Sequence, residues 1–396
     1  MGDDDRRGTH VPARRLVGGD LPGAGHLRGG SGFQSAGGRA ARCLRRGDRA
    51  VASGELTGVG RRTAETGTEP LLAIEDLVIH FRLYEGRARV INGVNLTIGR
   101  GESVALVGET GCGKSVTAKA ILGLLPANAE IVSGRITFQG RDLLRLPAEE
   151  LQRIRGRRIA MIFQDPGTAL NPVFTVGDQL QDVAAWQGRP RAPLVRRGDG
   201  ELRRRCLEIL RLVRIPDPEG TFRRFPVELS GGMRQRVLIA LALLGGPDLL
   251  IADELGTALD VSIQDQILEE LRELVRTRGL SVLYITHNLG VARLVSDRIC
   301  VMYGGEIAEV APTGAMFTRQ LHPYAQGLLA AVPRLTGGVG AGIEGRIPDY
   351  LNPPPACRFA PRCPFRMDLC DRQRPVLAQA EPDRRVACHL YPASTR

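Results

Sequence analysis

The sequence predicts an α/β protein whose core is a mixed β-sheet, and two patterns lead to this prediction. Short apolar runs at residues 103–107 and 249–252 are each followed by a polar turn and then by a stretch with helical spacing. Buried strands that alternate with helices are typical of a parallel sheet covered on both faces. Residues 71–81 and 90–98 follow one another with only a turn between them, which predicts a small antiparallel sheet before the parallel one.

Length and charge exclude several classes of protein. The chain has 396 residues, enough for two or three domains, and a net charge of +11 with only 4% aromatic residues. Its arginines are dispersed, so we expect no nucleic-acid partner. We find no apolar run of the roughly 18 residues that cross a bilayer, and no apolar signal core at the N-terminus. We therefore expect a cytoplasmic chain that meets the membrane through a partner.

The first 69 residues are rich in glycine, arginine and aspartate and show no lasting periodicity. Such a segment cannot bury much apolar surface, which predicts a disordered tail at 1–69. A start codon assigned too far upstream explains the same composition equally well. Ordered structure is expected to begin with the strand at 71–81, where Phe81 is a candidate for stacking on an adenine ring. Tyr84 is the competing candidate, and Phe81 as a core residue is the alternative.

A glycine-rich segment at 108–115 fits the phosphate-binding pattern G-x-x-x-x-G-K-[ST]. A predicted strand precedes it and a predicted helix follows from Val116, as this P-loop pattern requires. Its backbone N–H groups and the helix N-terminus would hold phosphates, Lys114 would reach the β- and γ-phosphates, and Ser115 would bind Mg²⁺. The predicted nucleotide contacts are Gly108, Glu109, Thr110, Gly111, Cys112, Gly113, Lys114, Ser115 and Val116.

Polar residues follow several other predicted strands. Gln164 ends the strand at 158–163, and His287 follows the strand at 281–286. Asp253 and Glu254 end the strand at 249–252, where the first carboxylate would hold Mg²⁺ and the second would polarise a water. Strand ends of this kind form ligand sites in α/β folds, so Gln164 is expected near Mg²⁺ or the attacking water and His287 near the γ-phosphate.

A second glycine-rich segment, Leu229-Ser230-Gly231-Gly232, precedes an apolar helix. A hydroxyl, backbone N–H groups and a helix N-terminus again make an anion site. One chain has no use for two phosphate sites facing one nucleotide, whereas two chains arranged head to tail do.

With these motifs assembled, residues 71–390 resemble the ATP-binding subunits of ABC transporters. The phrases at 161–166, 170–172, 230–236 and 322–324 resemble the oligopeptide/dipeptide importer subfamily. The resemblance implies a P-loop ABC ATPase fold over residues 70–320, with a helical signature subdomain at about 165–230. A C-terminal region at 321–396 would follow.

The resemblance also implies a dimer that encloses two ATP molecules, each between one P-loop and the other chain's Ser230, Gly231, Gly232 and Asp260. Glu254 would be the catalytic base, His287 would sense the γ-phosphate, and Gln164, Ser115 and Asp253 would hold Mg²⁺. The second ATPase would be another copy or a paralogue. Two permease subunits and, indirectly, an extracytoplasmic substrate-binding protein would complete a peptide importer, with this chain peripheral on the cytoplasmic face of the membrane. The alternatives are a soluble non-transport ABC ATPase, or an importer of nickel chelates or glutathione.

One segment departs from the family pattern. The family usually has Asp-Glu-Pro-Thr where this chain has Asp253-Glu254-Leu255-Gly256. Losing the proline would loosen the segment that positions Glu254, so we expect hydrolysis to survive at a lower rate. A non-enzymatic regulator is the alternative reading of this change.

The C-terminal region contains Cys357, Cys363, Cys370 and Cys388, among prolines that favour rigid loops. Four thiolates suit zinc or an iron–sulfur cluster, and thiols without any ligand are the third alternative. Many members of the resembling subfamily carry this tail, and some are thought to bind a [4Fe–4S] cluster through it. Three further cysteines of the predicted ATPase domain are expected to be packing thiols: Cys112, Cys206 and Cys300.

Overall fold

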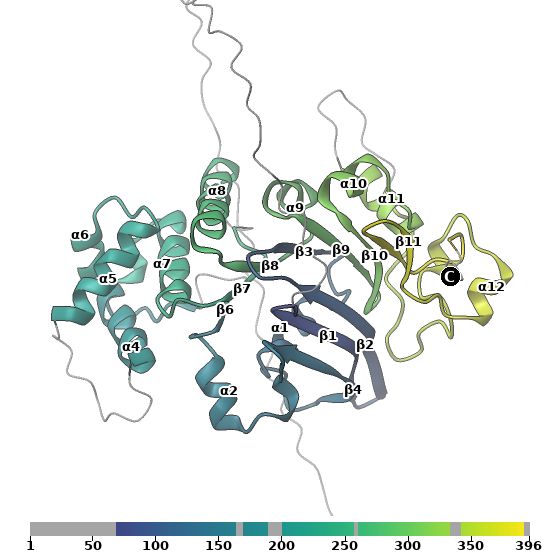
Figure 1. Ribbon diagram of the computed structural model, residues 1–396, viewed down its shortest axis with the longest axis horizontal. Helices are drawn as coiled ribbons and strands as arrows, with labels where there is room; N and C mark the ends of the chain where they lie inside the picture. Colours follow the sequence, from purple (N-terminus) through teal and green to yellow (C-terminus); the bar gives the residue numbers. More distant parts are fainter. Residues whose placement is uncertain (1–68, 164–168, 189–199, 257–259, 333–341, 392–396) are drawn as a thin grey trace, which may run out of the picture. The chain divides into compact units, whose positions relative to one another are not determined.

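A computed structural model describes residues 69–163, 169–188, 200–256, 260–332 and 342–391 of the chain (Figure 1). Contacts divide the chain after residue 64, and every described residue belongs to the second unit. The predicted tail at 1–69 therefore lies outside the described residues, apart from Glu69. In the described part no helix is both long enough and apolar enough to span a membrane.

The first sheet is antiparallel and has the strand order β2-β1-β4-β5. Its strands are β1 (Leu72–Leu83), β2 (Gly86–Ile98), β4 (Ala129–Phe138) and β5 (Arg141–Asp142). The pair β1–β2 starts from the register Leu72↔Ile98 and closes with Leu83↔Gly86. The antiparallel sheet predicted from residues 71–98 is therefore confirmed, and β4 extends it on the other side of β1.

The second sheet is mixed, with the order β11-β12-β10-β9-β3-β8-β7-β6 among the described strands. Its parallel part runs from β6 to β9, and its antiparallel part from β9 to β11. The bounds are β3 (Ser103–Val107), β6 (Ile159–Ile162), β7 (Leu249–Asp253), β8 (Ser281–Thr286), β9 (Arg298–Tyr303), β10 (Glu306–Pro312), β11 (Ala378–Glu381) and β12 (Arg384–Val386).

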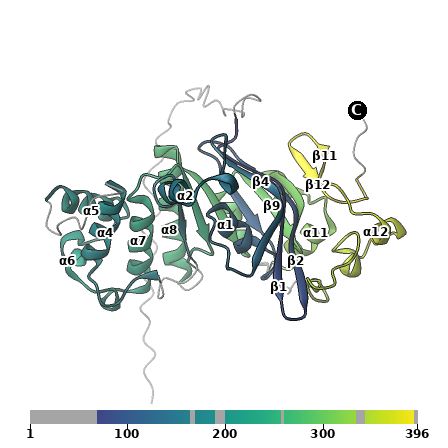
Figure 2. The same cartoon turned by 90° about the horizontal axis from the view of Figure 1, so that it is seen from below.

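The central strands are apolar throughout because both faces of this sheet are buried. Along β3, Ala105 and Val107 belong to one core cluster, whereas Val104 and Leu106 belong to the other. The first cluster lies between the sheet and its helices, and the second between this sheet and the antiparallel one. Figure 2 shows β1, β2 and β4 beside α1 (Lys114–Ile121), which packs in the second cluster.

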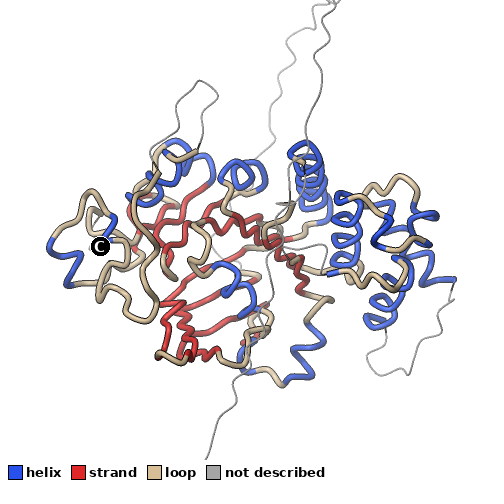
Figure 3. Tube along the Cα trace, turned by 180° about the vertical axis from the view of Figure 1, so that it is seen from behind, coloured by secondary structure: helices blue, strands red, loops and turns tan. Residues whose placement is uncertain are grey.

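The remaining helices surround this frame. A helical subdomain contains α4 (Val176–Gly188), α5 (Gly200–Leu212), α6 (Pro218–Arg223), a 3₁₀ turn η2 (Pro226–Glu228) and α7 (Gly231–Leu243). Figure 3 shows this group as helices and loops without strands, and α7 contacts β6. The other helical segments are η1 (Leu143–Arg145), α2 (Ala148–Ile154), α8 (Val261–Arg278), α9 (Leu289–Val295), α10 (Thr313–Thr318), α11 (Pro323–Ala330), η3 (Ala360–Arg362) and α12 (Asp368–Arg372).

The C-terminal region is joined to the sheet through a buried carboxylate. Glu309 on β10 is fully buried and accepts hydrogen bonds from the backbone N–H groups of Leu321 and His322. It also forms a 2.8 Å ion pair with Arg384 of β12. A buried charge is tolerated when it is paired and hydrogen-bonded in this way. Strands β11 and β12 therefore continue the mixed sheet.

Candidate nucleotide-binding site

The P-loop, residues 108–115, leaves β3 and enters α1, which confirms the strand–loop–helix order expected from the sequence. Two of its glycines lie too close to their neighbours for a side chain, Gly108 beside backbone and Gly113 beside the Ile91 side chain. A Cβ at Gly108 would lie 2.2 Å from the carbonyl oxygen of Met302, and one at Gly113 would lie 2.7 Å from Ile91. Gly113 also has φ 110 at the N-cap of α1, a conformation that favours glycine.

Lys114 and Ser115 begin α1 on the inner side of the loop. Lys114 is only 5% exposed, and its Nζ donates to the carbonyl oxygens of Gly108 at 2.8 Å and Glu109 at 3.0 Å. The ammonium group is thus held inside the curve of the loop, where phosphate oxygens bind in P-loop sites. Ser115 Oγ donates to Asp253 Oδ1 at 3.2 Å.

Asp253 comes to Ser115 because β7 and β3 both pair with β8 in parallel. Parallel neighbours end at the same edge of the sheet, so residues after these strands meet there. Burial raises the pKa of the Asp253 carboxyl, and the Ser115 hydroxyl acts in the opposite direction. A hydroxyl and a carboxylate side by side are oxygen ligands of the kind Mg²⁺ prefers.

The same edge brings together Glu254 and His287, which follow β7 and β8. His287 Nδ1 lies 3.1 Å from Glu254 Oε1, and the Glu254 N–H donates to Ile285 O at 2.8 Å. Glu254 has φ 50, an uncommon conformation for a residue with a side chain. Strained backbone of this kind is often found at functional sites. A carboxylate bonded to an imidazole can accept and orient a proton.

The segment that departs from the family pattern adopts a second left-handed conformation. Gly256 has φ 85, and a Cβ there would lie 2.9 Å from Gln264 Cγ. Leu255 between the two positions is buried in the core. The backbone conformation at position 256 therefore favours glycine, whereas the family usually has threonine there. Residues 257–259 lie outside the described residues.

Two expected contacts are not tested by this geometry. Gln164 lies outside the described residues, although β6, which leads to it, pairs with β7. Phe81 on β1 is partly buried and packs against the second core cluster, whereas Tyr84 in the β1–β2 turn is fully exposed. The assignment of an adenine-stacking ring remains a prediction.

The second glycine-rich segment begins α7. Ser230 is the N-cap and accepts a 3.3 Å hydrogen bond from the Met233 N–H, as expected for a serine at this position. Ser230 and Gly231 are exposed, whereas Gly232 is buried and a Cβ there would lie 2.8 Å from Ile263. Asp260, the exposed N-cap residue of α8, comes just before Ile263.

Comparisons with known proteins identify the family. A family model described as ABC transporter matches residues 91–256, and one described as oligopeptide/dipeptide transporter, C-terminal region, matches 308–370. The dipeptide transport ATP-binding protein DppD of Bacillus subtilis is 46% identical over 325 residues, covering 81% of this chain and 95% of DppD. The chain belongs to the ATP-binding subunits of oligopeptide/dipeptide ABC transporters. The oligopeptide transport ATP-binding protein AppD of the same organism is 41% identical over 324 residues, covering 81% of this chain and 97% of AppD.

Solved structures of ABC cassettes agree with this assignment. The dimeric post-hydrolysis structure of the ATP-binding cassette MJ0796, bound to ADP and Pi, is 27% identical with a TM-score of 0.53. The match covers 63% of this chain and 100% of that one. The predicted P-loop ABC ATPase fold and the predicted family are therefore confirmed, and the chain is an ATP-hydrolysing transporter subunit.

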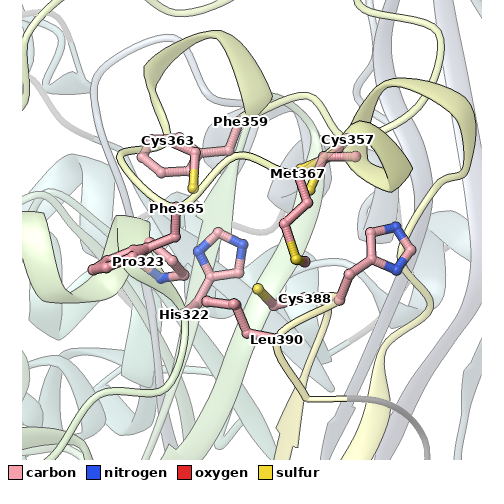
Figure 4. A pocket seen from close by; sticks show the side chains of 11 residues that line it. His322, Pro323, Cys357, Phe359, Cys363, Phe365, Met367, Cys388 and Leu390 are labelled. Atoms are coloured by element: carbon pink, nitrogen blue, oxygen red, sulfur yellow. The ribbon is translucent and has the colours of Figure 1, made fainter.

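The C-terminal region of this ABC subunit gathers its cysteines around one pocket, here called the thiol pocket (Figure 4). Its lining residues are His322, Pro323, Cys357, Phe359, Cys363, Phe365, Met367, Cys370, Cys388, His389 and Leu390. Burial raises the pKa of the Cys357 thiol to about 12 and also raises those of Cys363 and Cys388. Without a bound cation these thiols are therefore uncharged near neutral pH.

The thiol pocket offers cysteine sulfurs, which are suitable metal ligands, but these side chains are not arranged to bind a metal together. All four cysteines line it, which a thiolate-bound metal needs. Among the described residues, however, no three or more histidine, cysteine or acidic side chains form a group that could hold a metal ion. The predicted iron–sulfur site is thus not supported. The other three described cysteines, Cys112, Cys206 and Cys300, are buried, as expected of packing thiols.

Sequence reasoning missed three residues that contact the P-loop from the C-terminal region. They are Tyr324, Tyr350 and Arg362. The sequence motif His322-Pro323-Tyr324 could have indicated one of them. In the structure His322 caps α11, Pro323 is the first residue of that helix, and Tyr324 is fully buried. No comparable signal marks Tyr350 or Arg362.

Proposed function

We propose that this chain hydrolyses ATP to energise the import of peptides through a membrane permease. The observation that carries the proposal is the joint match to peptide-transporter subunits along almost their whole length, including the C-terminal region. The relatives DppD and AppD are named for dipeptide and oligopeptide transport. A soluble non-transport ATPase is not favoured, because the second family model is specific to these transporters.

For hydrolysis, we propose that the side chains at the sheet edge divide the work. Ser115, Asp253 and Gln164 would hold Mg²⁺, which supplies positive charge against the phosphates. Glu254 would accept the proton of the attacking water, and His287, 3.1 Å from it, would orient that carboxylate and contact the γ-phosphate. Phe81 would stack on adenine, and Lys114 and the P-loop N–H groups would hold the phosphates.

We further propose that hydrolysis requires two chains. Ser230 and Gly231 are exposed at the start of α7, and Asp260 is exposed at the start of α8. These groups would complete the nucleotide site of a second ATPase subunit, which is either another copy or a paralogue. The solved relative MJ0796 is itself described as dimeric.

For the membrane partner, we propose a docking groove beside β6. The groove is open to the surface, and its lining includes Leu124, Met161, Phe163 and Leu241. Phe163 is 44% exposed although it is aromatic, and it comes directly before Gln164. A pair of permease subunits docked there would place this chain on the cytoplasmic face of the membrane. A change at the groove would then reach the catalytic edge through β6.

A mild-detergent pull-down of the tagged full-length chain from its native membranes tests this function. We expect two multi-span permease subunits, with or without a second ATPase. The matched variants are Phe163→Asp in the groove and Val376→Asp, which is 76% exposed and lies in the C-terminal region. Phe163→Asp should lose the permeases while still binding ATP, and Val376→Asp should retain both. Recovery with nucleic acid or ribosomes and no permease would contradict the proposal.

We also propose the finer division of the chain into a tail at 1–69, an ATPase domain at 70–320 and a C-terminal region at 321–396. Within the last, we propose that Cys357, Cys363, Cys370 and Cys388 take up a [4Fe–4S] cluster, with a rearrangement of the thiol pocket on binding. All four line one pocket, and the rearrangement is needed because no three of the described side chains form a group that could hold a metal. Iron, acid-labile sulfide and the visible absorption of anaerobically purified protein test it, with Cys370→Ser as the variant that should lose all three signals.

A further inference from the structure

The P-loop is held from outside the ATPase motifs. Three side chains of the C-terminal region reach Glu109 and Gly111, two P-loop residues that the sequence motif leaves unspecified. Tyr324 lies 215 positions from Glu109, Tyr350 lies 239 from Gly111, and Arg362 lies 253 from Glu109. The three contacts meet different groups of the loop: a backbone N–H, a backbone carbonyl and a carboxylate. Together they fix the backbone and one side chain of the loop.

The first contact fixes a backbone amide. The Glu109 N–H donates to the hydroxyl oxygen of Tyr324 at 2.9 Å. Tyr324 is fully buried, and its ring packs on Tyr303 at a centroid distance of 4.6 Å and on Phe359 at 5.5 Å. Because this aromatic cluster is closely packed, the hydroxyl has little freedom to follow a moving loop.

The second contact is an ion pair on the neighbouring side. Arg362 Nη1 lies 2.9 Å from Glu109 Oε2, and the arginine side chain is only 6% exposed. Its other nitrogens donate to the carbonyl oxygens of Ile343 and Glu344, which fixes the guanidinium plane. Burial alone would lower the pKa of Arg362, but Glu109 and Tyr303 together outweigh burial and raise that pKa. The pair is therefore a charge-assisted contact with a fixed donor.

The third contact fixes a carbonyl. The Tyr350 hydroxyl donates to Gly111 O at 2.8 Å. The Tyr350 carbonyl in turn accepts from the Arg89 N–H on β2 at 2.7 Å, so the residue is tied to the antiparallel sheet at its backbone. Gly111 has φ 86, a conformation that glycine adopts readily, and the Tyr350 hydroxyl fixes the direction of its carbonyl.

We propose that Arg362 and Tyr350, together with Tyr324, are positioning residues that hold the P-loop in the shape that receives phosphates. A loop whose N–H groups are already oriented loses less entropy on binding, so its affinity is higher. The affinity for nucleotide then depends on the C-terminal region, although that region carries no nucleotide motif. The chemical step depends on Glu254 at another strand and is not affected directly.

Nucleotide binding and ATP turnover of the full-length chain test this inference, with the fluorescent nucleotide mant-ADP as the probe. Tyr350→Phe removes one hydroxyl, and Arg362→Gln removes one charge. Each should raise the dissociation constant and KM about three- to tenfold, with kcat changed less than about twofold. Arg366→Gln is the matched control, because Arg366 belongs to the same segment but pairs with Asp371 at 2.7 Å.

A double-mutant cycle separates positioning from general damage. Glu109→Gln should weaken binding as Arg362→Gln does, and the double variant should be no weaker than either single one. Amide exchange at residues 108–113 should also accelerate, while exchange in β3 and β8 stays as in the parent. Unchanged mant-ADP affinity in both Tyr350→Phe and Arg362→Gln, with folding intact by circular dichroism, would overturn the inference. Fully additive effects in the cycle would overturn it as well.

Discussion

The P-loop and the signature segment at 229–232 use the same local chemistry but differ in their surroundings. Both are glycine-rich, and both begin a helix, α1 or α7. The P-loop is held by its own chain: Lys114 is 5% exposed and bonds to its own loop, and the C-terminal region contacts the loop from outside. Ser230, by contrast, is exposed and its hydroxyl bonds to its own helix end. The P-loop is thus organised by contacts within its own chain, whereas the signature segment presents its groups outward.

These two segments show that a short glycine-rich sequence can form an anion site, and that the tertiary contacts around it determine whether it is organised within one chain. A P-loop organised within one chain can bind nucleotide before any partner arrives. The exposed start of α7 would instead meet the nucleotide that a second chain presents to it. Binding and turnover should therefore respond to different groups of residues, and the predictions below test that separation.

The largest effect is expected at Glu254. Glu254→Gln keeps the size of the side chain and its hydrogen bond toward His287 but removes the base. Turnover should fall by about a hundredfold or more, while mant-ADP affinity stays within about twofold of the parent. Glu269→Gln is the control, since Glu269 on α8 is 65% exposed and lies apart from the catalytic edge. Turnover that survives Glu254→Gln would remove the assigned base.

The next effect is expected at the signature segment. Ser230→Asp keeps an N-cap residue for α7, so the melting temperature should change little. Its added negative charge would face the partner's phosphates, and turnover should fall about tenfold or more. Binding of mant-ADP by the same chain should not change, whereas Lys114→Ala should weaken it strongly. Equal loss of mant-ADP binding in both variants would contradict this division of roles between the two segments.

A smaller effect is expected where the chain departs from its family. A proline at 255 disfavours the left-handed conformation that Glu254 adopts at φ 50. Leu255→Pro/Gly256→Thr should therefore move Glu254 to a different backbone conformation and raise kcat about two- to fivefold. Gly256→Thr alone should lower thermal stability, because φ 85 strains a β-branched residue. Equal turnover of parent and double variant would refute the loosening of this segment.

The smallest effect concerns pH and the support of the P-loop. His322 caps the helix that carries Tyr324, and burial lowers its pKa from 6.5 to about 4. The unfolded chain then binds more protons than the folded one between these values, so stability is complete above about pH 6.5 and falls as pH drops toward 4. His322→Asn retains a cap but cannot titrate. Its melting temperature should vary less between pH 7 and 5 than that of the parent, and an equal variation would exclude His322 as the cause.

The parallel sheet and its catalytic edge could be predicted because local sequence patterns mark both of them. The runs at 103–107 and 249–253 are apolar because both faces are buried, and polar residues after them share one edge by the parallel register. This is why Asp253, Glu254 and His287 could be placed together from sequence. Strands β11 and β12 have no such pattern. They are short and largely polar, and β12 joins β10 through a brief antiparallel pairing at Glu309↔Val386 and through the buried ion pair of Glu309 with Arg384.

The contacts of Tyr350 and Arg362 could not be predicted for a related reason. Neither residue lies in a motif, a strand or an α-helix, although Arg362 ends the short 3₁₀ turn η3, and each acts through one terminal group on a loop more than two hundred positions away. Loop-to-loop contacts of this kind depend on the path of the whole chain, so local spacing carries no information about them. The thiol pocket could be predicted in part: the sequence identified its four cysteines as a group, but not how their side chains are arranged.

The long separation between the P-loop and its outer contacts also has a consequence for biosynthesis. The ribosome produces residues 108–115 early, whereas Tyr350 and Arg362 follow 239 and 253 positions after their P-loop partners. Once His287 has been made, the nascent chain contains the whole ATPase motif set but not yet Tyr350 and Arg362. Contacts that span such long separations form late in folding. The nascent chain would therefore bind nucleotide more weakly until Tyr350 and Arg362 have been made. A stalled or prematurely terminated chain would compete poorly for cellular ATP.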